Sequence, residues 1–172
     1  SELFKVGESP EKFKYYQEHP KPPTLAIVFG QLFHAMALQP ETVSEQFVID
    51  PKISKKSNAG KDEWKAFLEE NKDKTIVTAD MYQQATEMCE ALNKNEFVKK
   101  LFKGEKEKEF FWVDDMTGEE CKCRVDVLTE LGENSIVVDL KSTENAETEA
   151  FMKSAIKYGY DLQRGKWSEI YL

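Results

Sequence analysis

The 172-residue sequence predicts an α+β fold, in which helices flank a small, mixed but mainly antiparallel central sheet. Residues 1–104 favour helices, because capping residues and prolines bound mostly apolar or amphipathic segments there. In residues 105–172 the apolar residues alternate with polar ones in short segments separated by turn residues. This pattern indicates strands before a last helix. The length suits one domain with a buried core. We therefore expect a single domain, 1–172, with a mostly helical part (1–104) followed by a hairpin and a helix (105–172).

The first part is expected to begin with a short helix. Ser9 fits its N-cap and Pro10 its first position, and it should end near His19. The elements expected after it are, in order, a mostly apolar helix from Thr24 to about Leu38, a strand or extended segment over 44–49, a polar loop from Lys52 to Gly60, a helix over 62–70, an extended piece over 75–78 whose Thr78 caps the next helix, and helices over 79–92 and 96–102.

The second part is expected to be a meander. Strands are predicted over 109–113, 120–128 and 135–140, with turn residues at 114–118 and 132–134 between them. Because the connections are so short, neighbouring strands should pair antiparallel. A final helix, capped near Thr143 or Asn145, should run from about Glu147 to Gln163.

The net charge and the number of cysteines limit which classes of function are favoured. A net charge of −8 gives no support to nucleic-acid binding by itself, since a basic patch is the normal footprint. A local basic cluster could still face phosphates while acidic helices face solvent; it consists of Lys52, Lys55, Lys56 and Lys61. Three cysteines, an odd number, favour a reducing cytoplasm over a disulfide framework. The C-x-C formed by Cys121 and Cys123 has no second cysteine pair or histidine cluster nearby, which argues against zinc or an iron–sulfur cluster.

The membrane classes are not favoured either. No apolar run approaches the length of a membrane span, and the first residues do not follow the pattern of a signal peptide. The sequence therefore predicts a cytoplasmic protein.

The residues with the most chemical information lie on the predicted hairpin. Asp126 lies on its first strand, and Asp139 and Lys141 end the second as Asp-x-Lys. Side chains alternate along a strand, so neighbouring strands would bring the two carboxylates together with the lysine beside them. Two carboxylates and a backbone carbonyl such as that of Leu140 suit Mg²⁺, and Lys141 could deprotonate a water or offset phosphate charge. The alternative is a surface hairpin with an ordinary Asp–Lys ion pair.

Four further residues are candidates for the site, and each also has a purely structural interpretation. His34 lies on the stripe of its helix formed with Ile27, Gln31 and Leu38, so it should face inward or into a cleft, where histidines are more often hydrogen-bonded core residues than ligands. Tyr160 and Gln163 would share one face of the last helix, near a phosphate or a water, or simply pack against the sheet. Glu107 belongs to a run of alternating Glu and Lys that is typical of a solvated segment.

The order of these motifs resembles one nuclease family. The segments that carry the resemblance are Gly30 to Glu41 (GQLFHAMALQPE), Lys55 to Glu63 (KKSNAGKDE), Cys121 to Asp126 (CKCRVD), Val138 to Thr143 (VDLKST) and Tyr158 to Gln163 (YGYDLQ). This series, which covers about residues 9–163, resembles the RecE (exonuclease VIII) type of phage and prophage exonuclease within the PD-(D/E)xK superfamily, whose core resembles restriction endonucleases. Val125 stands where the superfamily has proline; that proline shapes the backbone and does no chemistry.

The resemblance implies a metal-dependent 5′-to-3′ exonuclease on double-stranded DNA ends that acts in phage-type recombination. It implies that His34, Asp126, Asp139 and the Leu140 carbonyl ligate Mg²⁺, with Mn²⁺ as a substitute because imidazole is a softer ligand. Lys141 would be the catalytic lysine. The other residues that match the family are Tyr160 and Gln163 after that lysine, Glu107 as an acidic position, and Lys55, Lys56, Asn58 and Lys61 in a DNA-contacting loop.

The resemblance also implies partners, and two alternative functions stay open beside the exonuclease. It implies a ring-shaped homo-oligomer and a single-strand annealing protein as partner. Related nucleases continue with further strands and helices after the position of Leu172, which leaves open a core that is incomplete at this end or a shortened chain. An endonuclease or repair nuclease of the same superfamily is one alternative. The other is a catalytically silent, prophage-derived protein that binds DNA or a protein without cleaving.

Overall fold

The protein, analysed as a computed structural model, is described from residue 9 to residue 160, and it has the α+β composition that the sequence predicts. The chain divides into two compact units. The first comprises Pro23–Glu107 and Asp126–Leu140, and the second comprises the rest of the described residues. Within residues 9–160 no helix combines the length and the apolar character needed to cross a membrane.

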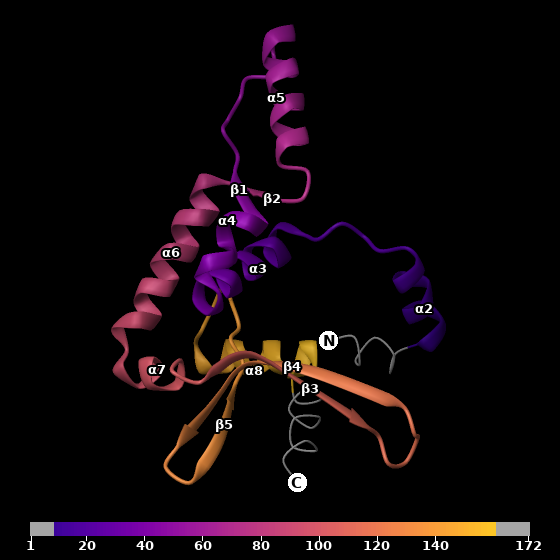
Figure 1. Ribbon diagram of the computed structural model, residues 1–172, viewed down its shortest axis with the longest axis vertical. Coiled ribbons are helices and arrows are strands. Elements are labelled where there is room, and N and C mark those ends of the chain that lie inside the picture. The colour runs from indigo at the N-terminus through magenta and orange to yellow at the C-terminus, as the bar shows by residue number, and fades with distance from the viewer. Residues whose placement is uncertain (1–8, 161–172) are drawn as a thin grey trace. The chain divides into compact units, whose positions relative to one another are not determined.

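Two capped helices form the core of the first unit. Helix α3 (Leu25–Leu38) begins at Thr24, whose hydroxyl accepts a hydrogen bond from the Ile27 amide, and α6 (Ala79–Lys94) begins at Thr78 in the same way. Both helices lie where the sequence predicts them, and they pack against each other (Figure 1). The buried side chains of this core are Val28, Leu32, Phe33, Ala35, Val43, Phe47, Val77, Ala85 and Leu140.

A short parallel pair of strands continues this core. β1 (Phe47–Ile49) pairs with β2 (Thr75–Val77). The prediction of an extended segment over 44–49 is wrong for its first half, because a 3₁₀ turn (η1, Pro40–Thr42) runs directly into helix α4 (Val43–Gln46). Proline at the first turn favours a helix, and only residues with a partner strand become extended.

Three more helices lie among residues 9–104. α2 (Pro10–Glu18), capped by Ser9, and α7 (Glu96–Leu101), capped by Asn95, match their predicted positions. α5 (Asn58–Glu70) begins four residues earlier than expected, because the Ser57 hydroxyl accepts a hydrogen bond from the Gly60 amide at 3.1 Å. The polar loop therefore ends at Ser57 instead of Gly60.

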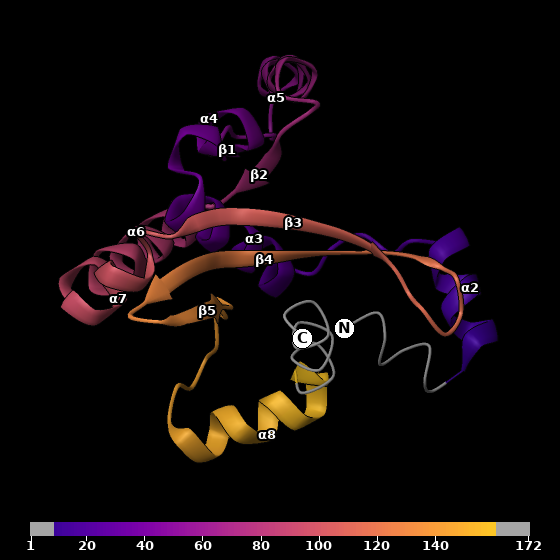
Figure 2. The same ribbon diagram turned by 60° about the horizontal axis from the view of Figure 1, so that its bottom comes forward.

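The predicted meander is present as an antiparallel three-stranded sheet of order β3–β4–β5. Its strands are β3 (Glu105–Val113), β4 (Glu120–Leu131) and β5 (Asn134–Val138), and β3 runs alongside β4 in Figure 2. Val127 faces Val138 across β4 and β5, and Leu131 faces Asn134 at the turn. Val125, Val127 and Thr129 are buried on one face of β4, as strand alternation requires.

The last described helix is shorter than predicted. α8 (Thr148–Tyr158) has Glu147 at its N-cap position, without a side-chain cap, and Gly159 ends it in the left-handed conformation with φ 64°. The predicted cap at Thr143 or Asn145 is wrong, because their side chains bond within the preceding turn and Asn145 accepts from the Glu147 amide. The continuous helix to Gln163 is also wrong, since a left-handed glycine is a common helix terminator.

Gly104, just before β3, lies directly against the backbone of β4. A Cβ at this position would lie 2.2 Å from the Leu128 carbonyl oxygen and 2.6 Å from the Thr129 Cβ. We expect Gly104→Ala to lower the free energy of unfolding by about 2–3 kcal/mol, because the backbone of β4 must move. Urea denaturation measures this loss.

Gly132→Ala is the control: Gly132 has φ 66° but open space around it, so only the left-handed strain of about 1 kcal/mol should appear. Equal losses for the two variants would contradict the close-packing explanation.

Candidate metal centre

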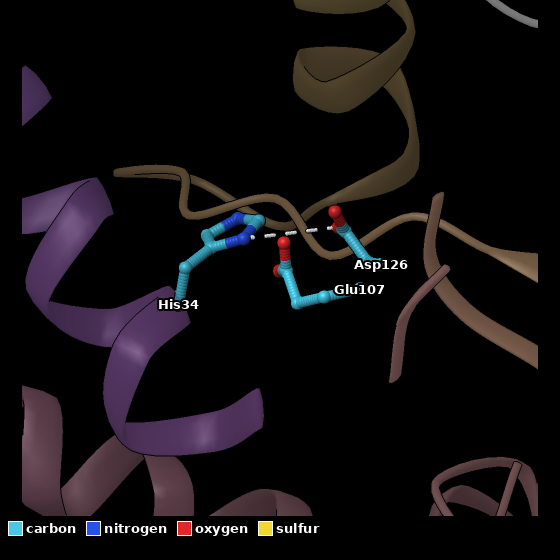
Figure 3. A group of neighbouring side chains, drawn as sticks. All are labelled: His34, Glu107 and Asp126. Carbon is cyan, nitrogen blue, oxygen red and sulfur yellow. Dashed lines mark ion pairs between the residues drawn. The ribbon is translucent and has the colours of Figure 1, made fainter. Parts of the chain in front are cut away.

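Three potential metal ligands from separate parts of the first unit lie close together. One ligand atom each of His34, Glu107 and Asp126 lies within 4.8 Å of the other two, and all three side chains are half-buried. His34 comes from α3, Glu107 from β3 and Asp126 from β4, and the three point toward one another in Figure 3. Within residues 9–160 this is the group of three or more histidine, cysteine or acidic side chains that could hold a metal ion.

His34 reaches the group from the core helix. Its neighbours Phe33 and Ala35 are buried, so the helix is fixed, while the His34 side chain itself stays 29% exposed. The stripe predicted to face inward is only partly buried, because Leu38 lies in the core but Ile27 and Gln31 are exposed. The histidine thus lies where the helix surface passes from solvent to core.

Asp126 is held in place by the backbone of the adjacent chain segment. It lies between the buried residues Val125 and Val127, so its own side chain points to the opposite face of β4. Its Oδ2 accepts a hydrogen bond from the Leu140 amide at 2.6 Å and lies 3.8 Å from His34 Nδ1. The carboxylate is only 16% exposed, and this short bond restricts its rotation.

Glu107 reaches the group through an irregularity in β3. Its φ of 52° is left-handed, which is rare for a residue with a side chain and is common at strained functional positions. The alternation of β3 slips there: Glu107 and Lys108 are both half-buried, whereas from Lys108 onward inner and outer residues alternate. A shift of this kind is typical of a β-bulge, which re-aims a side chain. With this left-handed backbone the Glu107 side chain points toward Asp126 (Figure 3), whereas its charged run predicts a solvated position.

Asp139 and Leu140 lie at the end of the same hairpin. The paired register ends at Val127 and Val138, so Asp139 is the first residue after β5, and its position opposite Asp126 stays a prediction. Asp139 is half-buried and is not among the three residues of the ligand group. The Leu140 side chain is buried in the core, and its amide donates to Asp126.

The donor set fits a hard divalent cation. Two carboxylates within 4.8 Å of each other repel unless a positive charge lies nearby. The three ligand atoms, within 4.8 Å of one another, are close enough for one Mg²⁺ to be held by His34, Glu107 and Asp126 together. The imidazole makes Mn²⁺ an equally suitable ion.

The remaining catalytic candidates belong to the second unit. Lys141 is half-buried, and its Nζ lies 5.4 Å from the ring centroid of Tyr160. The Tyr160 ring also contacts Phe151 and stacks on Tyr158. The interruption at Gly159 separates Tyr160 from α8, and Gln163 lies outside the described residues.

The four predicted DNA-binding residues surround the start of α5. Lys55 and Lys56 lie in the loop before it, Asn58 and Lys61 lie in its first turns, and all four are exposed. Trp64 is an additional residue at this place, and the centroid of its ring lies 3.5 Å from the Lys55 ammonium. Its position two turns into the helix, beside a lysine-rich loop, was the available signal.

Comparisons with known proteins assign the chain to a family. A family model described as "PDDEXK-like domain of unknown function (DUF3799)" matches residues 1–171. A comparison with curated proteins found no match. The matched family is named for a nuclease-type core that combines acidic residues with a lysine, and this agrees with the acidic cluster around His34 and the Asp-x-Lys that follows it. The chain therefore belongs to the PDDEXK-like family DUF3799.

Proposed function

We propose that this protein is a Mg²⁺-dependent deoxyribonuclease, and specifically a 5′-to-3′ exonuclease that acts on double-stranded DNA ends. The observation that carries the proposal is the convergence of His34, Glu107 and Asp126 to within 4.8 Å. Membership of a PDDEXK-like family supports it, because cores of that kind are associated with cleavage of nucleic acids. The exonuclease type and its polarity rest on the resemblance of the motifs to the RecE type.

Each residue has a distinct task in the proposed reaction. His34, Glu107 and Asp126 hold the cation, with Asp139 and the Leu140 carbonyl as further ligands on the same hairpin. A bound divalent cation supplies a Lewis acid for the phosphate and lowers the pKa of a coordinated water. Lys141, two residues after Asp139, accepts the proton of the attacking water or offsets the growing phosphate charge. Tyr160 and Gln163 orient the phosphate or the water.

The substrate side of the proposal is double-stranded DNA. The segment that holds Lys55, Lys56, Asn58 and Lys61 would lie against its backbone, since phosphate contacts supply most of the sequence-independent affinity. A ring-shaped homo-oligomer and a single-strand annealing partner complete the proposal, and both rest on the resemblance alone. The cytoplasm, expected from the unpaired cysteines, is the proposed location.

A comparison of linear and covalently closed DNA tests the reaction. With Mg²⁺ we expect mononucleotides to be released from linear duplex, with a 5′ label released before a 3′ label, and closed circles to stay intact. Lys141→Ala should slow the release by about 10²–10⁴-fold, as expected for loss of a general acid or base. Asp139→Ala should reduce it by a comparable factor. The rates are measured by gel electrophoresis and scintillation counting.

Each alternative has its own outcome in this assay. Cutting of closed circles would point to an endonuclease of the same superfamily. Binding of duplex without release of nucleotides in either Mg²⁺ or Mn²⁺ would point to a catalytically silent DNA-binding protein. Unchanged release by the Lys141 and Asp139 variants would refute the proposed mechanism.

A further inference from the structure

The loop that precedes α5, residues 50–57 and hereafter the lysine loop, is fastened to that helix at three points. A Cβ on Gly60 would lie 1.9 Å from the Ser54 carbonyl oxygen, so the loop backbone rests directly on the helix and only glycine fits. The Lys55 ammonium lies 3.5 Å from the centroid of the Trp64 ring. The Ser57 hydroxyl caps the helix through the Gly60 amide.

The beginning of the lysine loop is fixed as well. The Asp50 amide donates to the Val77 carbonyl of β2, and the Asp50 carboxylate accepts from the Lys52 amide at 2.8 Å. Lys52 has a left-handed φ of 56°, a conformation that residues with a side chain rarely hold without support from their surroundings. The lysine loop is therefore tied to β2 at its first residue, Asp50, and to α5 at its last, Ser57.

The lysines of this segment differ in what their ammonium groups do. Lys55 covers the Trp64 ring, which in turn stacks on Phe67 with centroids 5.4 Å apart. A cation so close to an aromatic face is engaged in a cation–π interaction. The side chains of Lys52, Lys56 and Lys61 are exposed to solvent.

We propose that the lysine loop is a preformed contact for the DNA phosphate backbone, in which Lys55, Gly60 and Trp64 are positioning residues and Lys56 makes the phosphate contact, assisted by Lys52 and Lys61. This inference rests on the proposed nuclease function. The chain carries a net charge of −8, so a rigid loop with exposed lysines is a local exception that suits a polyanion. A loop that is already ordered loses little entropy on binding.

The ordering part of the inference is tested without DNA. Limited trypsin digestion, followed by mass spectrometry, measures the rate of cleavage after Lys52, Lys55 and Lys56. We expect Trp64→Ala to raise this rate about two- to fivefold, as the loss of an exposed cation–π interaction predicts. Trp64→Phe, which keeps an aromatic face, should largely restore the wild-type rate. Leu68→Ala removes an exposed apolar side chain from the same helix and is the matched control.

The contact part is tested by binding. Fluorescence anisotropy of a labelled linear duplex, measured in EDTA from 25 to 250 mM NaCl, gives the affinity and its dependence on salt. We expect Lys56→Met to reduce the slope of log K against log salt by about 0.9, the value for one phosphate contact. Trp64→Ala and Gly60→Ala should weaken binding about two- to fivefold with little change of slope, because they disorder the loop without removing a contact.

The outcomes separate the inference from the function on which it rests. A Lys55→Met variant that lowers the slope as much as Lys56→Met would overturn the division of roles between the two lysines. Unchanged trypsin cleavage of Trp64→Ala would overturn the fastening of the loop. Absence of duplex binding by the wild type would overturn the DNA role and the proposed function together, while the digestion result would still decide whether the loop is ordered by Trp64.

Discussion

Replacing Asp126 with asparagine should abolish metal-dependent DNA cleavage and leave the fold nearly as stable as the wild type. The Asp126 carboxylate does two things: it belongs to the ligand group with His34 and Glu107, and its Oδ2 accepts from the Leu140 amide at 2.6 Å. Asparagine keeps an oxygen that can accept this bond but loses the negative charge that a hard cation requires. Cleavage should fall by about 10³-fold or more, since such a centre contributes several kcal/mol to the transition state.

Asp126→Ala is the companion variant. It should be as inactive as Asp126→Asn but less stable by about 1–3 kcal/mol, because the Leu140 amide loses its acceptor in a partly buried place. Urea denaturation in EDTA measures stability without a contribution from metal, and nucleotide release from linear duplex measures activity. Two variants of equal stability would contradict the structural role of the carboxylate. An active Asp126→Asn would contradict its role as a ligand.

Replacing Glu107 with glycine should stabilise the metal-free protein and inactivate it at the same time. Glu107 holds φ 52°, which costs a residue with a side chain about 1–2 kcal/mol, whereas glycine adopts it freely. The change also removes one of the three candidate metal ligands. The extra flexibility of glycine in the unfolded chain offsets part of the gain, so we expect a net rise of about 0.5–1 kcal/mol.

Thermal unfolding with and without divalent cations separates the two effects. In EDTA the Glu107→Gly variant should melt above the wild type. Adding Mg²⁺ or Mn²⁺ should raise the melting temperature of the wild type but much less that of the variant, because ligand binding stabilises only the state that binds it. Glu105→Gly, two residues earlier in the same strand, is the control and should lower the melting temperature without affecting the metal response. A full metal response of Glu107→Gly would remove this residue from the proposed centre.

The fold was predictable where local signals agree with the tertiary structure. Ser9, Thr24 and Thr78 each precede a helix and cap it in the structure, and the glycine- and asparagine-containing turns separate the three strands of the meander. The predicted secondary structure was wrong where the local sequence preference is weak and tertiary contacts decide the conformation. Residues 44–46 contain no strong helix signal, yet they continue the turn that Pro40 starts, and Gly159 ends α8 at a place where the residues around it favour a longer helix.

The candidate site was predictable in part for the same reason. Strand alternation and the short turn predict Asp139 opposite Asp126, and the structure pairs the two strands as far as Val127 and Val138, one residue short of that position. The position of Glu107 could not be derived in this way. A regular strand would place Glu107 on the face opposite Lys108, and no residue type in this segment signals the left-handed backbone that Glu107 adopts. The Lys55–Trp64 contact also depends on tertiary structure, since it needs the Gly60 backbone to bring the loop onto the helix.

The hydrogen bond between Asp126 and the Leu140 amide has a consequence for folding. It lies just past the last paired residues of β4 and β5, Val127 and Val138. A slip of one residue in this hairpin would turn Asp126 to the other face of the sheet, breaking the bond and dispersing the ligand group in a single step. The Asp126 side chain, proposed to hold the cation, therefore also favours the native pairing of β4 and β5. A hairpin paired in another register would lose both this hydrogen bond and the metal site.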